Sequence, residues 1–241
     1  MTRNIFTAMV FLALVVPATA QETPSWSVAF NLGTDVALTG NVHDSGSGSV
    51  LALPTTVESR TYDNIYGKPL TWSADLGYMV SPTGEVRARV FRTSGEAERI
   101  QVGNVATLPL FAKFDSYTTL GVDVGYRQYL TRNDSPIIPF AGASVGLLNV
   151  DKIRSTFSVP AASVVLSDVS MYDSTMALSF AVSAGVMIPF GSNFGIQGGI
   201  DFRWHGDLNP VDGLAGSGLE PLNDKSRRWS MPVTVGAVVR F

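Results

Sequence analysis

Charged side chains that could form a reactive or ion-pairing cluster recur at alternating positions along this chain of 241 residues. They fall between apolar residues, so an extended backbone would place the charges on one face and the apolar residues on the other. The set holds four acids and four bases, namely Asp35, Asp75, Arg87, Arg89, Asp123, Arg127, Asp201 and Arg203. If residues 81–83 form a turn, Asp75 lies directly opposite Arg89 on the next strand, and we expect these two side chains to pair.

Catalytic groups, by contrast, are scarce. The chain has two histidines and no cysteine, which excludes thiol catalysis, disulfides and Cys-based zinc sites. His43 lies in a Gly/Ser-rich stretch, where we expect a solvated side chain. His205 precedes Asp207, with Ser217 or Ser226 further along, but a Ser–His–acid site needs hydrogen-bond contact between base and nucleophile. The sequence shows no spacing that supplies this contact, so we predict no enzyme, no metal and no other cofactor.

Composition narrows the class of protein. Charged residues make up 15% of the chain and aromatic residues 10%, and there are 23 glycines. Soluble domains carry roughly 25% charged residues. The formal net charge is −3, and without a basic face there is no case for nucleic-acid binding. These totals favour many strands that each turn one face toward a hydrophobic environment.

The first twenty residues have the features of an export signal. Arg3 supplies a positive start, Ile5–Val16 is an apolar run, and Ala18–Ala20 fits the small-x-small cleavage pattern. The run is too short to cross roughly 30 Å of hydrocarbon as a helix. We therefore predict a cleaved signal peptide at residues 1–20 and a single mature domain at residues 21–241.

Alternation of apolar and polar residues continues through the mature chain, which indicates strands. At its start, one face is formed by Trp26, Val28, Phe30, Leu32, Val36 and Leu38. Eight segments share the pattern: 26–38, 70–80, 85–93, 116–130, 137–148, 176–188, 194–204 and 229–241. A transmembrane helix at residues 176–190 is the alternative for one of them, but its length of about fifteen residues is short of the roughly twenty required.

The connections between these segments alternate in length. Three are short and rich in turn-forming residues, at 81–84, 131–135 and 190–193. Four are long, at 39–69, 94–115, 149–173 and 205–228. A compact soluble domain rarely tolerates four such loops, whereas a transmembrane barrel has short turns at one rim and long loops at the other. Because a sheet in hydrocarbon must close, we predict an all-β fold: an up-and-down antiparallel transmembrane barrel of eight strands.

Aromatic residues fall near the ends of these strands. At the short-turn rim we place Trp26, Tyr78 and Tyr126, and at the long-loop rim Trp72, Trp204 and Trp229. Two aromatic girdles are expected where a barrel meets the membrane surfaces. The alternative, a soluble exported β-sandwich with aromatics in its core, does not explain why they lie at strand ends.

The charged face would then line the inside of the barrel. The interior of an eight-stranded barrel is about filled by side chains. We therefore predict a lumen closed by Asp–Arg pairs and small residues. A small-solute channel is the alternative.

Two segments carry a family resemblance. Val233–Phe241 is an alternating last strand that closes on a C-terminal aromatic residue, and it resembles the signal that the barrel-assembly machinery recognises, with Phe241 as its key residue. Pro139–Gly146 is similar to a Pro-aromatic-x-Gly-x-Gly strand start. With these segments the mature chain resembles the outer-membrane β-barrel family that includes OmpA-, OmpX- and opacity-type proteins.

The resemblance implies a location and partners. It places the chain in the outer membrane of a Gram-negative bacterium, among lipid and lipopolysaccharide, after handling by periplasmic chaperones and the barrel-assembly machinery. The peptidoglycan-binding domain of full-length OmpA-type proteins would be missing. The family's lipid A deacylases keep their His and Ser two residues apart on one strand. Here Asp207 stands two residues beyond His205, so a lipid A-modifying enzyme is the least favoured alternative.

Function is therefore expected in the long loops, where scaffolds usually carry it. Residues 50–53 and 164–166 are apolar pieces within these loops. They either extend the strands past the membrane as hairpin ribs or contact a ligand or another surface. We predict a structural and surface-interaction protein of the outer membrane, whose surface ligand the sequence does not identify.

Overall fold

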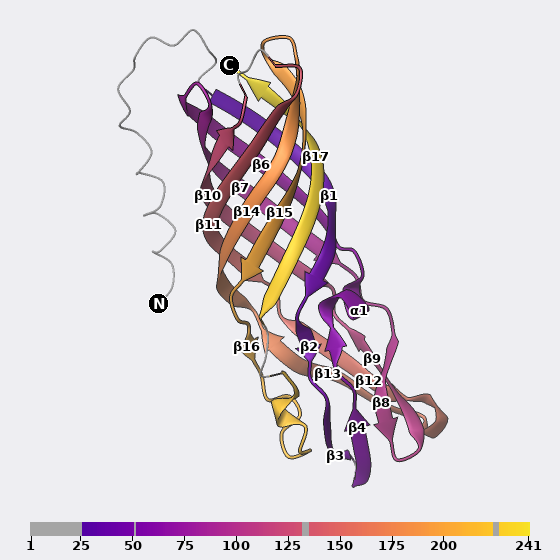
Figure 1. Ribbon diagram of the computed structural model, residues 1–241. Helices are drawn as coiled ribbons and strands as arrows, with labels where there is room; N and C mark the ends of the chain where they lie inside the picture. Colours follow the sequence, from indigo (N-terminus) through magenta and orange to yellow (C-terminus); the bar gives the residue numbers. More distant parts are fainter. Residues whose placement is uncertain (1–25, 51, 132–134, 224–226) are drawn as a thin grey trace.

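The computed structural model describes residues 26–50, 52–131, 135–223 and 227–241. The predicted signal peptide at residues 1–20 lies outside this part of the chain. The molecule is elongated, with a barrel at one end and a second sheet at the other (Figure 1).

Eight long strands close into the barrel. They are β1 (Trp26–Thr39), β6 (Leu70–Ser81), β7 (Gly84–Gly95), β10 (Tyr117–Tyr129), β11 (Ile138–Val150), β14 (Thr175–Phe190), β15 (Phe194–His205) and β17 (Arg228–Arg240). Their order around the ring is β1-β17-β15-β14-β11-β10-β7-β6, and β6 pairs with β1 to close it. Every neighbouring pair is antiparallel. The predicted eight-stranded antiparallel barrel is confirmed.

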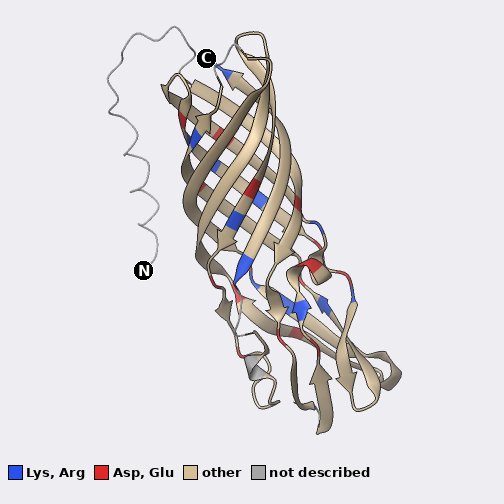
Figure 2. Cartoon of the chain, in the orientation of Figure 1, with Lys and Arg blue, Asp and Glu red and all other residues tan. Residues whose placement is uncertain are grey.

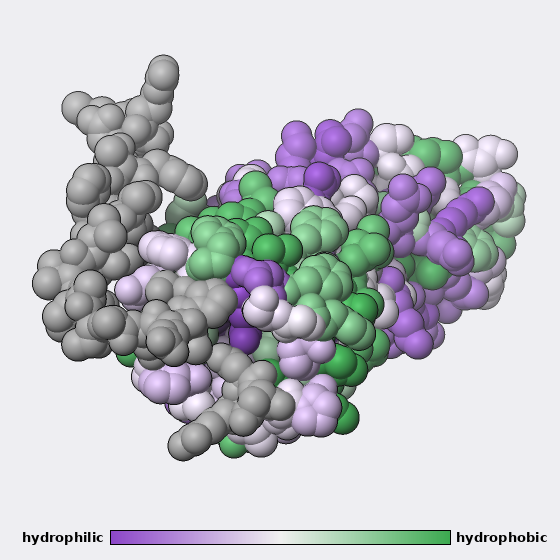
Figure 3. All heavy atoms as spheres, turned by 90° about the horizontal axis from the view of Figure 1, so that it is seen from above, coloured by the Kyte–Doolittle hydropathy of each residue, from purple (hydrophilic) through white to green (hydrophobic). Residues whose placement is uncertain are grey.

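The barrel is apolar outside and polar inside. Val124 is 58% exposed and Val235 is 59% exposed, whereas the neighbouring Asp123 is only 4% exposed. Figure 2 shows long uncharged stretches along the barrel strands, and in Figure 3 apolar side chains gather over the barrel. Exposing so much apolar surface to water is unfavourable, whereas hydrocarbon accommodates it. This arrangement is that of a transmembrane β-barrel.

The long connections fold into further elements, which the sequence analysis did not assign. The first contains β2 (Asn41–His43), β3 (Gly46–Val50), β4 (Leu53–Val57), β5 (Arg60–Thr61) and the helix α1 (Tyr62–Tyr66). The others contain β8 (Ile100–Val105), β9 (Leu108–Phe114), β12 (Ile153–Val159), the 3₁₀ turn η1 (Pro160–Ala162), β13 (Val164–Asp173), β16 (Asn209–Pro210) and η2 (Glu220–Asn223). No helix in the described part of the chain is long and apolar enough to span a membrane.

Seven of these strands join into one sheet beyond the barrel, in the order β16-β13-β12-β9-β8-β4-β3, which we call the loop sheet. Residues from all four long connections meet in it. Its apolar side chains form a hydrophobic core that continues to the adjoining end of the barrel, and buried members include Val42, Val102, Leu110, Phe114, Leu148 and Met171. Both apolar loop pieces belong to the loop sheet: Val50 of β3 pairs with Leu53 of β4, and Val164–Leu166 lies in β13.

The face of one residue differs from the prediction. Leu38 was placed with Trp26 on the outward face, but it is 1% exposed and belongs to the core of the loop sheet. The pairing of β1 with β17 shifts register between Asp35 and Leu38. A single extra residue in a strand moves the following side chains to the opposite face, and the alternation alone does not reveal where this happens.

A second apolar cluster fills the lumen near the short-turn rim. Its buried members are Ala29, Met79, Tyr129, Ile138, Phe140, Met187 and Val238. The alternation along the strands predicted only ion pairs and small residues inside the barrel. Large apolar side chains therefore add to the filling, and they do so at the end opposite the loop sheet.

Candidate functional site

The interior charges are brought together by the register of three neighbouring strands. Asp75 on β6 lies opposite Arg89 on β7, and Arg89 lies opposite Asp123 on β10. Because side chains alternate along a strand, all three point to the same side of the sheet. That side is the lumen, where each is at most 7% exposed.

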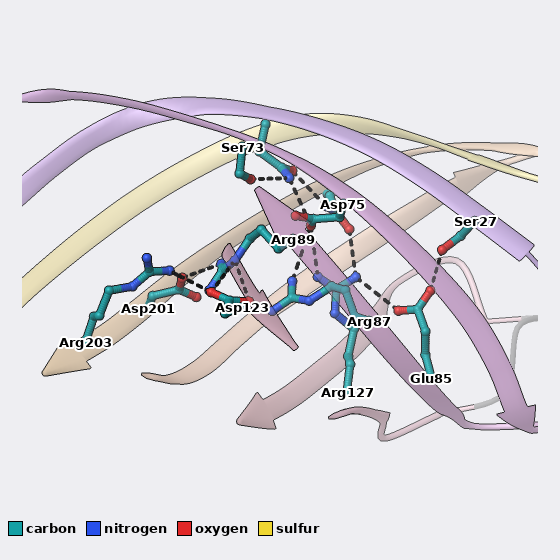
Figure 4. A network of polar contacts seen from close by, with 12 residues as sticks. Ser27, Ser73, Asp75, Glu85, Arg87, Arg89, Asp123, Arg127, Asp201 and Arg203 are labelled. Atoms are coloured by element: carbon teal, nitrogen blue, oxygen red, sulfur yellow. Dashed lines mark hydrogen bonds and ion pairs between the residues drawn. The ribbon is translucent and has the colours of Figure 1, made fainter. Parts of the chain in front are cut away.

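One group of ion pairs spans the lumen (Figure 4). Arg89 Nη1 lies 2.5 Å from Asp201 Oδ2, and Arg89 Nη2 lies 2.7 Å from Asp123 Oδ2. Arg203 Nη2 lies 3.0 Å from Asp201 Oδ2 and 3.5 Å from Asp123 Oδ2. Since β7 and β15 stand on opposite sides of the ring, the contact between Arg89 and Asp201 crosses the barrel.

A second group crosses the lumen through Arg127. Its Nη1 lies 3.5 Å from Glu85 Oε2 and donates to Gln197 Oε1 at 3.0 Å. Gln197 in turn donates to Asn31 Oδ1 at 2.7 Å, and Asn31 donates to Asp75 Oδ2 at 3.2 Å. Asp75 Oδ2 also lies 3.3 Å from Arg87 Nη1 and 3.9 Å from Arg127 Nη2. We call the two groups together the lumen network.

The prediction that Asp75 and Arg89 form an ion pair is wrong, although the two residues lie opposite each other on neighbouring strands, as predicted. Arg89 stands between two aspartates and makes its ion pairs with Asp123 and Asp201 instead. Its side chain is long enough to reach across a narrow barrel, so the opposite wall competes with the adjacent strand. A pairing across the lumen depends on closure and is not encoded in the spacing along the chain.

Asp35 has a different setting from the other predicted acids. It is 2% exposed, and its Oδ1 accepts the backbone N–H of Met231 at 2.7 Å. The ion pairs found among the described residues do not include Asp35. It thus satisfies the backbone of a neighbouring strand, near the bulge in β1.

Three buried charged residues, Glu85, Arg228 and Arg240, were missed. Glu85 is 1% exposed, and it accepts hydrogen bonds from Ser27 at 2.5 Å and from Tyr129 at 2.9 Å. It stands two residues before Arg87, so the alternation that placed Arg87 inside also places Glu85 there. Arg228, which the sequence analysis left in a loop, is fully buried.

Arg228 closes the end of the lumen that faces the loop sheet. Its guanidinium carbon lies 5.6 Å from the ring centre of Tyr62 and 5.8 Å from that of Tyr117. Nη1 donates to the Tyr117 hydroxyl at 3.4 Å, and Nη2 donates to the Gly206 carbonyl at 3.3 Å. Tyr62 comes from α1, so this short helix lies over the end of the barrel.

The predicted girdle residues lie on the outside of the barrel. Trp26 is 39% exposed and packs on Tyr78 with ring centres 4.8 Å apart, at the short-turn rim. Trp229 is 41% exposed, and it pairs in register with Trp204 near the other end. The other two also point outward, Trp72 being half-buried and Tyr126 exposed. Phe241 is 62% exposed, and its backbone pairs with that of Trp26.

His205 does not meet the partners considered from the sequence. It is 4% exposed, and its Nε2 lies 2.8 Å from the Ser230 hydroxyl. Asp207 is exposed and pairs with Arg227 at 3.6 Å, and Ser226 lies outside the described residues. Nδ1 of His205 has no hydrogen-bond partner among the described residues, so no carboxylate orients the ring. A serine is activated when an acid orients the histidine that serves as its base. Within the described part of the chain, this site lacks that contact between an acid and the histidine.

An apolar pocket lies inside the loop sheet and is the second candidate site. It encloses about 800 Å³ of space, part of it open to solvent. Apolar side chains from the sheet line it together with three leucines that precede or lie in η2. They are Val50, Leu53, Val57, Val105, Leu108, Leu110, Phe157, Val159, Ala162, Val164, Leu166, Met171, Leu214, Leu219 and Leu222. The polar residues of the lining are His43, Thr55 and Ser158.

His43 is buried, contrary to the solvated position expected for it. It is 1% exposed, and its ring stacks on Phe114 with centres 5.8 Å apart. Burial lowers the pKa of His43 from its ordinary value, so the ring is neutral near pH 7. Nδ1 lies 3.2 Å from the Asp44 carbonyl and must donate to it. Nε2 is then an acceptor, and it has no hydrogen-bond partner among the described residues.

Metal-ligating side chains do not gather in the described part of the chain, where no group of three or more His, Asp or Glu could hold an ion. The charges of the lumen network are paired with one another, and the pocket of the loop sheet offers an apolar lining.

Comparison with known proteins finds similar folds among solved structures. No family model matches the chain, and no curated protein does. Neisserial surface protein A is 14% identical with a TM-score of 0.46, covering 90% of this chain and 96% of that one. The attachment invasion locus protein Ail of Yersinia pestis is 13% identical with a TM-score of 0.43, covering 91% and 99%. OprG of Pseudomonas aeruginosa is 12% identical with a TM-score of 0.45, covering 91% and 97%.

Proposed function

We propose that this chain is an outer-membrane protein of a Gram-negative cell whose barrel anchors the loop sheet outside the cell, where the sheet acts as a surface-interaction module. One observation carries the proposal: all four long connections are built into a single sheet with its own hydrophobic core. Loops that only closed the barrel would not need such a core.

The membrane location is supported by the exterior of the barrel. Its outward side chains are apolar along the middle of every strand, and aromatic residues flank them at both ends. Both ends of the barrel domain, at Trp26 and Phe241, lie at the short-turn rim. In barrels of this kind the short turns face the periplasm and the long loops face outward. Lipid and lipopolysaccharide would surround the apolar exterior of the barrel. Phe241 suits recognition by the barrel-assembly machinery after periplasmic chaperones have bound the chain.

A tag inserted into the loop sheet tests this topology. We expect an epitope placed between Ala106 and Thr107, in the turn that joins β8 and β9, to be labelled by antibody on intact cells. The same epitope placed after Ser192, in a short turn, serves as the matched control and should be labelled only after the outer membrane is permeabilised. Labelling of the Ser192 tag on intact cells, or recovery of the protein from periplasmic extract without detergent, would contradict the proposal.

A small-solute channel is disfavoured by the lumen network and by the apolar cluster next to it. Reconstituted into planar bilayers, the protein is expected to give no large, steady, ohmic conductance, because side chains from opposite walls meet across the lumen. A known porin measured in the same bilayers is the positive control. Steady conductance steps whose size scales with salt concentration would show that the lumen is open.

Catalysis is not part of the proposed function. The contact between His205 and Ser230 lies in the lumen, where both residues are 4% exposed. Nδ1 of His205 has no hydrogen-bond partner among the described residues, so no acid orients the histidine at this site. A His205→Ala variant that lost a measured lipid A deacylation would contradict this part of the proposal.

A further inference from the structure

One edge of the loop sheet has no partner along part of its length. β13 pairs with β12 on one side along most of the strand. On its other side it pairs with β16 at Tyr172 and Asp173, and Val211 donates to the Met171 carbonyl. Among the described residues, no backbone hydrogen bond reaches that side of residues 164–167. Free N–H and C=O groups along a sheet edge are a template for pairing with another strand.

This free edge is apolar on both faces. Val164 and Leu166 line the pocket, whereas Val165 between them does not and points to the opposite face. Val165 is 64% exposed and Leu166 is 45% exposed. Charged residues, proline and bulges usually protect the edges of sheets from further pairing. Residues 164–167 contain no charge and no proline. Protection begins only at Asp168, a charged residue with φ of 58° where the pairing of β13 with β12 is irregular.

The sequence of the edge is complementary to itself in the antiparallel direction. If two copies pair with Val165 opposite Val165, then Val164 of each copy lies opposite Leu166 of the other, on the pocket side of the sheet. Ser167 lies opposite Ser163, which precedes β13. Aliphatic residues therefore meet aliphatic residues, and no like charges are brought opposite each other. A two-fold axis through the Val165 pair makes the two halves of the contact identical, as in the interfaces of most homodimers.

We propose that the free edge of β13 pairs with the same edge of a second copy of this chain, antiparallel and centred on Val165, so that the two loop sheets form one continuous sheet. Val164 packs against the hydrophobic core of the loop sheet, so its contact with Leu166 of the second copy extends that core across the two-fold axis. An unrelated strand would pair with the backbone, but the second copy also matches the side chains. The inference rests on the proposed function, because it names a partner for the surface-interaction module.

A single cysteine tests the register. The chain has no cysteine of its own. Cβ atoms directly opposite each other on antiparallel strands lie about 4.5–5.5 Å apart, close to the roughly 3.5–4.5 Å of a disulfide. We expect Val165→Cys in the full chain to form a disulfide-linked dimer under mild oxidation, seen as a band at twice the monomer mass on a non-reducing gel and lost on reduction.

The matched control is a cysteine on an interior strand of the same sheet. Thr56 is exposed and lies on β4, between β3 and β8, so Thr56→Cys should remain monomeric under the same oxidation. Cross-linking of Thr56→Cys to the same extent as Val165→Cys would show random collision. That result, or the absence of a dimer with Val165→Cys, overturns the proposal.

Association without a covalent link is tested by charge. Analytical ultracentrifugation in detergent is expected to give a dimer for the unaltered protein. Val165→Lys places two like charges opposite each other and should shift the protein to the monomer at the same concentration. Val165→Thr, which is β-branched and uncharged, should keep the dimer. All three proteins must show the same gel shift between unboiled and boiled samples. An unaltered protein that stays monomeric, or a dimer that survives Val165→Lys, overturns the proposal.

Intact cells show where the second copy comes from. Two populations that produce Val165→Cys with different epitope tags in the β8–β9 turn are mixed and oxidised. Disulfides between the two tags indicate pairing between cells, and disulfides within one population indicate pairing in one membrane, and either result supports a second copy. Cross-linking to a different protein without a homodimer overturns it. Failure of the surface-interaction proposal is separable, because ultracentrifugation reports self-pairing and tag labelling reports topology.

Discussion

Replacing Asp123 by alanine is expected to lower the free energy of unfolding by about 3–5 kcal/mol, because it breaks a buried charge network by removing one partner. The Asp123 side chain is 2% exposed and lies 2.7 Å from Arg89 and 3.5 Å from Arg203. Without it, two buried guanidinium groups would share the single carboxylate of Asp201. Urea unfolding in lipid vesicles, followed by tryptophan fluorescence and by the gel shift between unboiled and boiled samples, measures the change.

The matched control is an ion pair outside the barrel. Asp115 pairs with Arg154 at 3.0 Å, and the two side chains are 43% and 37% exposed. Exposed pairs contribute about 0–1 kcal/mol, so Asp115→Ala should cost little. If Asp123→Ala cost no more than Asp115→Ala, the lumen network would not be a sealed, water-poor interior, and the filled lumen would have to be abandoned.

Introducing a charge on the outward face of the barrel is expected to have the second large effect on stability. Val124 lies near the middle of β10 and is 58% exposed. In a membrane this side chain faces hydrocarbon, and arginine there is expected to destabilise the barrel by about 2–4 kcal/mol. The same urea titration in vesicles measures the loss for Val124→Arg.

Depth in the membrane supplies the control for this substitution. Leu130 directly follows β10 at the short-turn rim and is 62% exposed. Arginine near an interface costs about 0–1 kcal/mol, so Leu130→Arg should be mild. A soluble sandwich would tolerate both substitutions on an exposed face, and equal, small effects of the two would therefore rule out the membrane-spanning barrel.

The two experiments address opposite faces of the same strand. Asp123 and Val124 are neighbours in sequence, yet one is 4% exposed and the other 58%. A polar interior and an apolar exterior within one residue of each other make sense only if the strand separates a filled lumen from hydrocarbon. Large effects at both positions would establish the orientation of the sheet from energetics alone.

The barrel itself could be predicted from sequence because its signal is local and repeated. Side chains of a strand alternate between two faces, so a period of two along eight segments predicts strands, and short and long connections predict their rims. Closure then follows from the lack of water in hydrocarbon. The interior position of Asp75, Arg89 and Asp123 follows from the same alternation.

Other features were decided by contacts between segments distant in the chain. Arg89 pairs with Asp201 across the ring, and a bulge turns Leu38 inward. His43 lies in a Gly/Ser-rich stretch yet is buried, because strands from other connections pack over it. The loop sheet joins strands from all four long connections, so its order depends on contacts between segments that are distant in the chain.

Sequence by itself thus determined the strands, the faces they present and the barrel they close, because each follows from the chemistry of neighbouring residues and from the solvent around them. Tertiary structure alone decided the partners of the buried charges, the loop sheet and its apolar pocket. These features depend on how far side chains reach across the closed barrel and on which strands of the loops meet in space. The local sequence pattern predicts neither of them.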